Sequence, residues 1–233
     1  MSFQEKTVIV TGGSGALGSV IVQRFLAEQA QVSLSYLSGK EMDRVKDKIG
    51  QSLAVQADVT KEGDVIKLFD VVAKQFKRID IVVNTVGGFL ARKPVAEVSM
   101  EEWDLMMNMN LKSAFLCTRE ALRRMKGQPY GRIVNMSAMV GLAPSPGRAP
   151  YAISKAGVSL LTDLAAQEVK GSGITVNAIA PSIIKTEANL ASMPDQDSKK
   201  WVKPEEIADL ICYLCSDAGG AVTGTTLKAY GGV

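Results

Sequence analysis

Short apolar runs alternate with amphipathic stretches along the whole chain. The runs are rich in Val and Ile and mostly apolar at consecutive positions, as expected for strands covered on both faces. They lie at Thr7–Thr11, Val32–Tyr36, Leu53–Ala57, Ile79–Asn84, Arg132–Met136, Ile174–Ala178 and, more weakly, Thr225–Ala229. Apolar residues at helical spacing predict helices over Gly15–Gln29, Glu62–Phe76, Glu101–Met125, Tyr151–Val169 and Pro204–Cys215. This alternation predicts an α/β fold with a doubly wound parallel sheet of about seven strands.

Composition and charge narrow the class of protein. The 233 residues are 46% hydrophobic and 22% charged, which suits a single globular domain over residues 1–233. The net charge of +3 is small and dispersed, so we expect no nucleic-acid partner. No apolar run is long enough to cross a membrane, and the first six residues show no signal-peptide pattern. With an odd count of three cysteines, these features predict a cytoplasmic protein.

The chain contains no histidine, which excludes several catalytic machines. Ser-His-Asp and Cys-His triads, a HExxH zinc site and histidine bases are ruled out, so proton transfer must use Tyr, Lys, Cys or a carboxylate. Cys212 and Cys215 form a CxxC pair, but they lie within a predicted helix, and no second CxxC or histidine supplies the remaining zinc ligands. We therefore expect core residues there and no metal site.

A glycine-rich turn, Thr11–Gly18, follows the first predicted strand and begins the first helix. Glycines allow a tight turn and close approach of a ligand, and a helix N-terminus offers free N–H groups to a pyrophosphate. In a strand–turn–helix context this pattern predicts dinucleotide binding. It therefore indicates that the predicted parallel sheet has the Rossmann type of fold.

The end of the second predicted strand bears on the choice of cofactor. An NAD site of this type offers Asp or Glu there for the ribose diol, whereas this chain has Tyr36, Ser38 and Lys40. With no acid at that point, a 2′-phosphate would be tolerated and Lys40 could hold it. The sequence therefore favours NADPH over NADH, although Lys40 could equally be a solvated residue.

Tyr151 and Lys155 are one helical turn apart and therefore share a helix face. An ammonium beside a phenol lowers a pKa that is normally about 10, which makes Tyr151 a candidate proton donor. Asn110 interrupts the apolar stripe of helix Glu101–Met125 and needs partners when buried. It could be a structural bridge, or it could hold a water that relays protons to Lys155.

Together these residues resemble the short-chain dehydrogenase/reductase family over essentially the whole chain. The resemblance implies that Tyr151, Lys155 and Asn110 are catalytic. It also implies a cofactor site, in which Tyr151 and Lys155 take part together with Gly12, Ser14, Gly15, Ala16, Leu17, Gly18, Tyr36, Ser38, Lys40, Asp58, Val59, Asn84, Thr85, Val86, Gly87, Pro181, Ile184 and Thr186. Residues 182–203 form the expected substrate loop. The family commonly pairs as homodimers or homotetramers through the two long helices.

One position departs from the family pattern. The family has a catalytic serine thirteen residues before the tyrosine, and this chain has Ala138 there. Ser137 is adjacent, but neighbouring strand residues point to opposite faces. Quinonoid dihydropteridine reductases, a divergent branch, are similar in this alanine and in a stretch like Ser192–Trp201, which could also be purely structural.

The sequence therefore predicts an NAD(P)H-dependent reductase of a small carbonyl compound, such as a 3-oxoacyl compound or a ketone, with Tyr151 as proton donor. By position, Phe89, Leu90, Leu142, Ala143, Ile184 and Met193 are candidates for an apolar pocket wall. Two alternatives stay open: a dihydropteridine reductase-like enzyme, and a nucleotide-binding redox sensor with little catalysis.

Overall fold

Seven parallel strands form one continuous sheet at the centre of the protein. The computed structural model describes residues 2–90 and 92–233, so Met1, in the stretch tested for a signal peptide, lies outside the described residues. The strand order is β3-β2-β1-β4-β5-β6-β7, and every neighbouring pair is parallel. The strands are β1 Thr7–Thr11, β2 Gln31–Tyr36, β3 Leu53–Gln56, β4 Ile81–Asn84, β5 Gly131–Met136, β6 Ile174–Pro181 and β7 Thr226–Ala229. The predicted Rossmann-type, doubly wound parallel sheet is confirmed.

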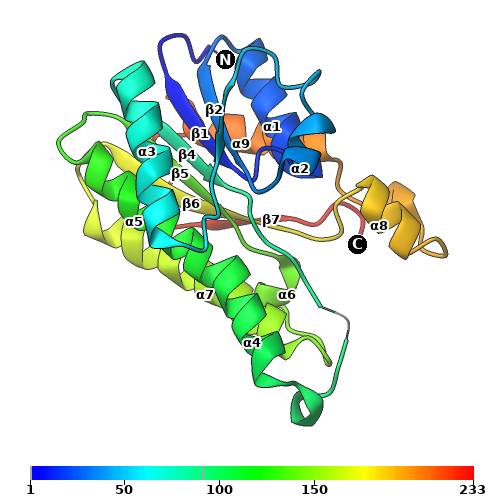
Figure 1. Cartoon of the computed structure of the whole chain (residues 1–233). Helices are drawn as coiled ribbons and strands as arrows, with labels where there is room; N and C mark the ends of the chain where they lie inside the picture. Colours follow the sequence, from blue (N-terminus) through cyan, green and yellow to red (C-terminus); the bar gives the residue numbers. More distant parts are fainter. Residues whose placement is uncertain (1, 91) are drawn as a thin grey trace.

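Helices cover both faces of this sheet (Figure 1). On one side lie α3 (Glu62–Phe76), α5 (Ser113–Met125) and α7 (Ala149–Glu168); on the other lie α1 (Ala16–Ala27) and α9 (Pro204–Cys215). The remaining elements surround the carboxyl ends of the strands or lead to them. They are α2 (Gly39–Asp43), α4 (Met100–Met106), α6 (Met139–Leu142), α8 (Glu187–Ser192) and the short 3₁₀ turns Val95–Glu97 and Ser198–Lys200.

The consecutive apolar residues of the strands supply two separate cores. In β1, Val8 and Val10 point into the cluster beneath α1 and α9, whereas Ile9 points into the cluster beneath α3 and α5. All three side chains are fully buried. Because successive strand residues face opposite sides, a strand with a helical layer on each face must be apolar throughout.

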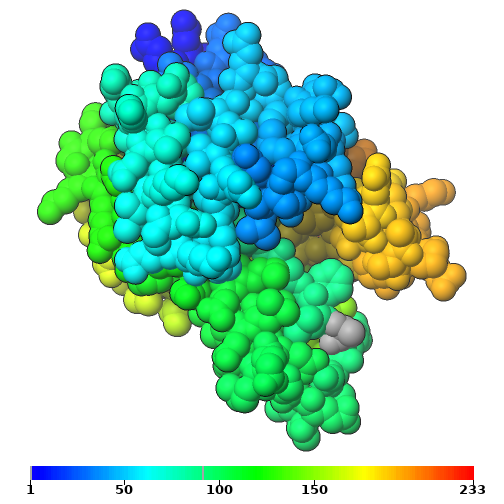
Figure 2. Space-filling view, viewed as in Figure 1, coloured from blue at the N-terminus to red at the C-terminus, as the bar shows by residue number. Residues whose placement is uncertain are grey.

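The strand order reverses at β1. The chain first adds β2 and β3 on one side of β1 and then adds β4 to β7 on the other side. Thr11 is paired with Asn84 at the carboxyl ends of β1 and β4. In sheets of this kind, ligands bind beyond the carboxyl ends of the strands at this switch point. Figure 2 shows a recess there, between the blue surface around α2 and the gold surface of α8.

The long helix predicted over Glu101–Met125 has an irregular centre. Residues Met107–Lys112 form a π-helical segment that joins α4 to α5. Asn110 lies within it and is 1% exposed. Such a segment widens the helix by one residue per turn and is frequent at functional sites. The sequence stripe indicated the helix but not this change in pitch.

The cysteine pair lies in the core, as expected. Cys212 and Cys215 are fully buried on α9, and burial raises the pKa of the Cys212 thiol to about 12. Among the described residues, no helix combines the length and apolar character needed to cross a membrane. The cytoplasmic location stays a prediction.

Candidate active site

The glycine-rich turn connects β1 to α1 by close packing of backbone on backbone. A Cβ atom on Gly18 would lie 2.3 Å from the carbonyl oxygen of Gly12, and one on Gly13 would lie 2.5 Å from Cβ of Leu34. Gly15, the N-cap of α1, has no side-chain cap, and the first turn of α1 contains no acidic residue. The free N–H groups of this turn therefore suit an anion such as a pyrophosphate. Gly12, Ser14, Ala16 and Leu17 lie in the same turn.

The loop after β2 contains an acid that the sequence pattern did not place there. Glu41 of α2 folds back so that its Oε2 atom accepts hydrogen bonds from Leu37 N at 3.1 Å and from Ser14 Oγ at 3.2 Å. Ser38 caps α2, with its Oγ accepting from Glu41 N, and Lys40 is exposed. The premise that no acid stands beside this loop is wrong, because one helical turn returns Glu41 to the strand end and to the glycine-rich turn.

Asp58 and Val59 follow β3 at the same edge of the sheet. The Oδ1 atom of Asp58 accepts hydrogen bonds from the N–H and the hydroxyl of Thr60, which lower the pKa of this carboxyl. Lys61 lies 3.2 Å from Oδ2, and Val59 is buried. The predicted contact of Asp58 with an adenine ring stays a prediction.

Lys155 is the most enclosed charged side chain of the site. It is 5% exposed, and its Nζ atom donates to the carbonyl oxygen of Met136 at 2.8 Å. Burial lowers the pKa of this ammonium to about 8. A Cβ on Gly87 would lie 3.0 Å from Nζ, so the loop after β4 passes directly over Lys155.

Tyr151 is half-buried, one turn from Lys155, as predicted. The expected lowering of its pKa by Lys155 is wrong for the protein without cofactor. Burial raises the pKa of this phenol, and the cation that opposes the rise is Arg148. Lys155 instead directs its ammonium at the Met136 carbonyl. The ring of Phe89 lies 6.3 Å from the Tyr151 ring between centroids.

Asn110 clamps the loop after β4. Its Oδ1 atom accepts from Gly88 N at 2.9 Å, and its Nδ2 atom donates to Gly88 O at 3.0 Å and to Ser154 Oγ at 3.1 Å. Both amide hydrogens are thereby used. These contacts favour the structural bridge over a direct role of this side chain in holding a relay water.

Asn84, Thr85 and Val86 connect β4 to this clamped loop. Thr85 Oγ1 donates to Thr11 O at 2.5 Å, which fixes the two strand ends together. Asn84 Nδ2 donates to Asn135 Oδ1 at 2.8 Å, whereas Asn84 Oδ1 is buried without a partner among the described residues. An unpaired acceptor at the ligand-binding edge is compatible with a donor supplied by a bound cofactor.

Ala138 occupies the position of the missing serine, packed with Val140 and Ala152 beside Tyr151. Ser137 does not replace it. Its Oγ atom donates to Lys155 O at 2.9 Å and lies 2.8 Å from Ser159 Oγ, on the α7 side of the strand. Although β5 ends at Met136, the backbone stays extended at Ala138, so Ser137 and Ala138 keep the opposite directions that the sequence indicated.

Residues 182–203 form a folded segment and not an open loop. Pro181 ends β6, Ile184 forms an isolated bridge with Val202, and Thr186 caps α8 by accepting from Asn189 N. Trp201 is 5% exposed, which fits a structural role for the Ser192–Trp201 pattern. The role of this segment as the substrate loop stays a prediction.

A small, partly open cavity lies beside Tyr151, between the loop after β4, α4 and the beginning of α7. Leu90, Val98, Met106 and Pro150 form its apolar part. Of the six residues expected to form an apolar wall, only Leu90 lines this cavity. Leu142 is exposed on α6, and Ile184 and Met193 belong to the folded segment of residues 182–203.

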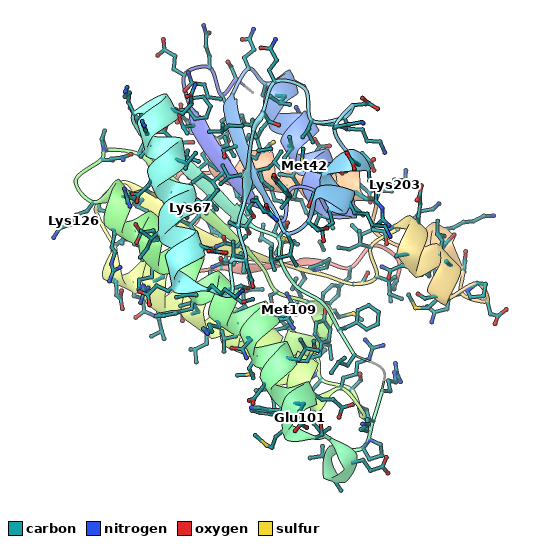
Figure 3. All side chains as sticks on the ribbon, viewed as in Figure 1. Met42, Lys67, Glu101, Met109, Lys126 and Lys203 are labelled. Atoms are coloured by element: carbon teal, nitrogen blue, oxygen red, sulfur yellow. The ribbon has the colours of Figure 1, made fainter. Side chains whose placement is uncertain are left out.

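The elements around the site come from distant parts of the chain. In Figure 3, Met42 marks α2, Met109 marks the π-helical segment and Lys203 marks the end of the folded segment, all around the carboxyl edge of the sheet. Fold and site together are those of a dinucleotide-binding oxidoreductase.

Comparisons with known proteins specify the family. A family model described as "Enoyl-(Acyl carrier protein) reductase" matches residues 13–233. The chain is 37% identical to 3beta-hydroxysteroid dehydrogenase 1 of Eggerthella lenta, over 98% of this chain and 93% of that protein. It is 32% identical to a 3-oxoacyl-(acyl-carrier-protein) reductase of Staphylococcus epidermidis, over 98% of each. The chain belongs to the short-chain dehydrogenase/reductase family of NAD(P)-binding oxidoreductases.

A solved structure agrees with this assignment. The 3-ketoacyl-(acyl-carrier-protein) reductase of Brucella melitensis, complexed with NADH, matches with a TM-score of 0.92 and 28% identity, over 99% of each chain. Similar chains thus include proteins named for steroid and for acyl-carrier-protein substrates. Their names do not choose between these substrates for this chain.

Gly87→Ala tests how closely the loop must approach the site. The new Cβ would lie 2.8 Å from Asn110 Oδ1 and 3.0 Å from Lys155 Nζ, so one side chain must leave its place. We expect a loss of about 1–3 kcal/mol in the free energy of unfolding, measured in urea, because a buried hydrogen bond is broken. Gly63→Ala in α3 is the control, since nothing lies within 4 Å of its Cβ. Equal stability of the two variants would contradict this close approach.

Proposed function

We propose that the protein is an NAD(P)H-dependent reductase of a small carbonyl compound, with Tyr151 as the proton donor. The observation that carries the proposal is the position of Tyr151 between the cavity and the loop after β4. Tyr151 lines the cavity, and Lys155, one turn away, lies beneath the loop that follows the switch-point strand β4. A carbonyl compound in the cavity would therefore meet both the proton donor and the cofactor edge.

The bound cofactor supplies the hydride in this chemistry. The glycine-rich turn would hold the pyrophosphate at the N-terminus of α1, and Asn110 keeps the loop at Gly87 and Gly88 in place. Lys155 offers two further ammonium hydrogens besides the one donated to Met136. They are available for the ribose hydroxyls of the cofactor.

The lost serine limits what the enzyme can reduce easily. Ser137 and Thr85, the two neighbouring hydroxyls, are already hydrogen-bonded to Lys155 O and Thr11 O. Losing one donor to a developing oxyanion can cost about 100-fold or more in rate. The favoured substrates are therefore activated carbonyls, whose oxygen needs less stabilisation.

The proposed function is tested by cofactor oxidation with three kinds of acceptor. NADPH and NADH are followed separately with a 3-oxoacyl thioester, with a small activated ketone and with a freshly generated quinonoid dihydropterin. Turnover of either carbonyl supports the proposal. Turnover of the pterin alone would replace it with a pteridine reductase, and cofactor binding with no turnover at all would favour a sensor.

Tyr151→Phe tests the proton donor. The variant keeps the ring but loses the acid, so kcat should fall by about 100- to 10,000-fold while cofactor affinity stays the same. Stopped-flow absorbance measures the first and quenching of protein fluorescence the second. Tyr213→Phe, at an exposed tyrosine on α9, is the matched control and should leave both unchanged. Retained turnover in Tyr151→Phe would remove this residue from the mechanism.

For the cofactor we propose NADPH, with a preference limited by two opposing charges. Lys40 supports it as the cation beside the loop after β2. Glu41 opposes it, because its carboxylate is held by Leu37 N and Ser14 Oγ at the same loop. A carboxylate in this place suits a ribose diol and repels a 2′-phosphate.

Two variants separate these charges. Glu41→Gln removes the repulsion and should raise the NADPH to NADH ratio of kcat/KM, whereas Lys40→Gln should lower it. We expect about tenfold in each direction, which corresponds to about 1.4 kcal/mol. Lys46→Gln, an exposed lysine beyond α2, serves as the control for general charge effects. Two unchanged ratios would show that neither side chain meets the ribose.

We further propose that the protein is a homodimer or homotetramer, assembled through α5 and α7. Large apolar side chains lie open on these helices, among them Phe115 at 43% exposure, Leu160 at 60% and Leu164 at 51%. A second copy of the chain offers the same apolar face, which is self-complementary under twofold symmetry.

Leu160→Asp tests this assembly. A carboxylate in an apolar interface should at least halve the mass measured by sedimentation velocity. Leu190→Asp on α8, also an exposed leucine, is the control and should keep the native mass. A wild-type monomer would contradict the proposal, as would a Leu160→Asp variant of native mass.

A further inference from the structure

Three charged side chains line the cavity beside Tyr151, and two of them form an ion pair with each other. Lys93 Nζ lies 2.6 Å from Glu102 Oε1, and Lys93 N donates to Gly147 O at 2.9 Å. The second oxygen of Glu102 accepts from Ser99 N at 2.9 Å. Lys93 and Glu102 therefore neutralise each other, and they join the loop after β4 to α4 and to the turn before α7.

The third charge, Arg148, is not compensated. It precedes Tyr151 by one helical turn and lines the same cavity. Its Nε atom is buried and has no hydrogen-bond partner among the described residues. No carboxylate of residues 2–90 and 92–233 forms an ion pair with its guanidinium; Glu102 in the same cavity pairs with Lys93. A half-buried guanidinium without a partner is unfavourable unless a ligand completes it.

The rest of the cavity limits the ligand. Leu90, Val98, Met106 and Pro150 provide an apolar surface, so the body of the ligand should be aliphatic or cyclic. The planar guanidinium fork matches a carboxylate by two parallel hydrogen bonds.

We propose that the substrate is an oxo acid, an apolar carbonyl compound whose carboxylate is bound by Arg148 while its carbonyl group faces Tyr151. This inference rests on the proposed reductase function and adds the chemical class of the substrate. The balance of the step is simple: the carbonyl carbon gains hydride from the cofactor, its oxygen gains the Tyr151 proton, and the carboxylate is unchanged. Arg148 is a specificity-determining residue in this arrangement, with its partner supplied by the substrate.

The first test compares an acid with its ester. Reduction of 4-oxopentanoate and of its methyl ester is followed with the wild type, Arg148→Met and Arg148→Lys. In the wild type the acid should be favoured by about tenfold in kcat/KM. Arg148→Met should lower kcat/KM for the acid about tenfold and leave the ester unchanged, and Arg148→Lys should recover part of the preference. Arg92→Met, at an exposed arginine on the loop after β4, is the control and should behave as the wild type.

Equal kcat/KM values for acid and ester in the wild type would overturn the inference. An equal loss for both in Arg148→Met would overturn it too, because it would indicate a disturbed site and not a lost anion contact.

A second test does not require turnover. Hexanoate and hexan-1-ol are titrated into the protein with bound reduced cofactor, and the change in cofactor fluorescence is recorded. Hexanoate should bind the wild type about tenfold more tightly than the alcohol and should lose this advantage in Arg148→Met. Equal binding of hexanoate by both proteins overturns the inference. Arg148-dependent binding without reduction of any carbonyl would leave the anion site standing and reject the reductase function instead.

Discussion

The buried ammonium of Lys155 is the constraint around which the site is built. Removed from water, it takes one partner from the protein, the carbonyl oxygen of Met136, and this bond joins the end of β5 to α7. The loop after β4 then passes close to the ammonium, which explains the glycine at position 87, where a Cβ would lie 3.0 Å from Nζ. Helix α6 packs against the backbone of the same lysine, where a Cβ on Gly141 would lie 2.8 Å from its carbonyl carbon. A charged group without solvent thus determines both backbone spacing and local sequence.

Around this lysine, polar side chains link the strand ends to the helices on one side of the sheet. Asn135 connects β5 to β4 through Asn84 and to α7 through Thr162, and Asn110 connects the π-helical segment to Gly88. Such bonds are directional, so they specify the loop geometry more narrowly than apolar packing does. The Oδ1 atom of Asn84 is the acceptor in this network that has no partner among the described residues.

Charge is distributed differently at the two ends of the site. At the β2 end, the Glu41 carboxylate accepts hydrogen bonds from two neutral donors, Ser14 Oγ and Leu37 N, and Lys40 beside it is exposed. At the cavity end, Lys93 and Glu102 neutralise each other, and Arg148 is the cation left over. Arg148 also opposes the rise that burial causes in the pKa of Tyr151. Because Arg148 is the N-cap of α7, the proposed proton donor and the cation that acts on its pKa are three residues apart.

The sequence by itself determined the layered fold, the glycine-rich turn, and the Tyr151–Lys155 pair, because each depends on residues near one another in the chain. Periodicity of two or 3.6 residues is a local property. Only the tertiary structure decided three other points. Glu41 met Ser14 of the glycine-rich turn, Ser137 turned toward α7, and the cavity wall came from the loop after β4 and not from residues 182–203. Each of these depends on which distant backbone segments meet at the carboxyl edge, and no local pattern encodes that meeting.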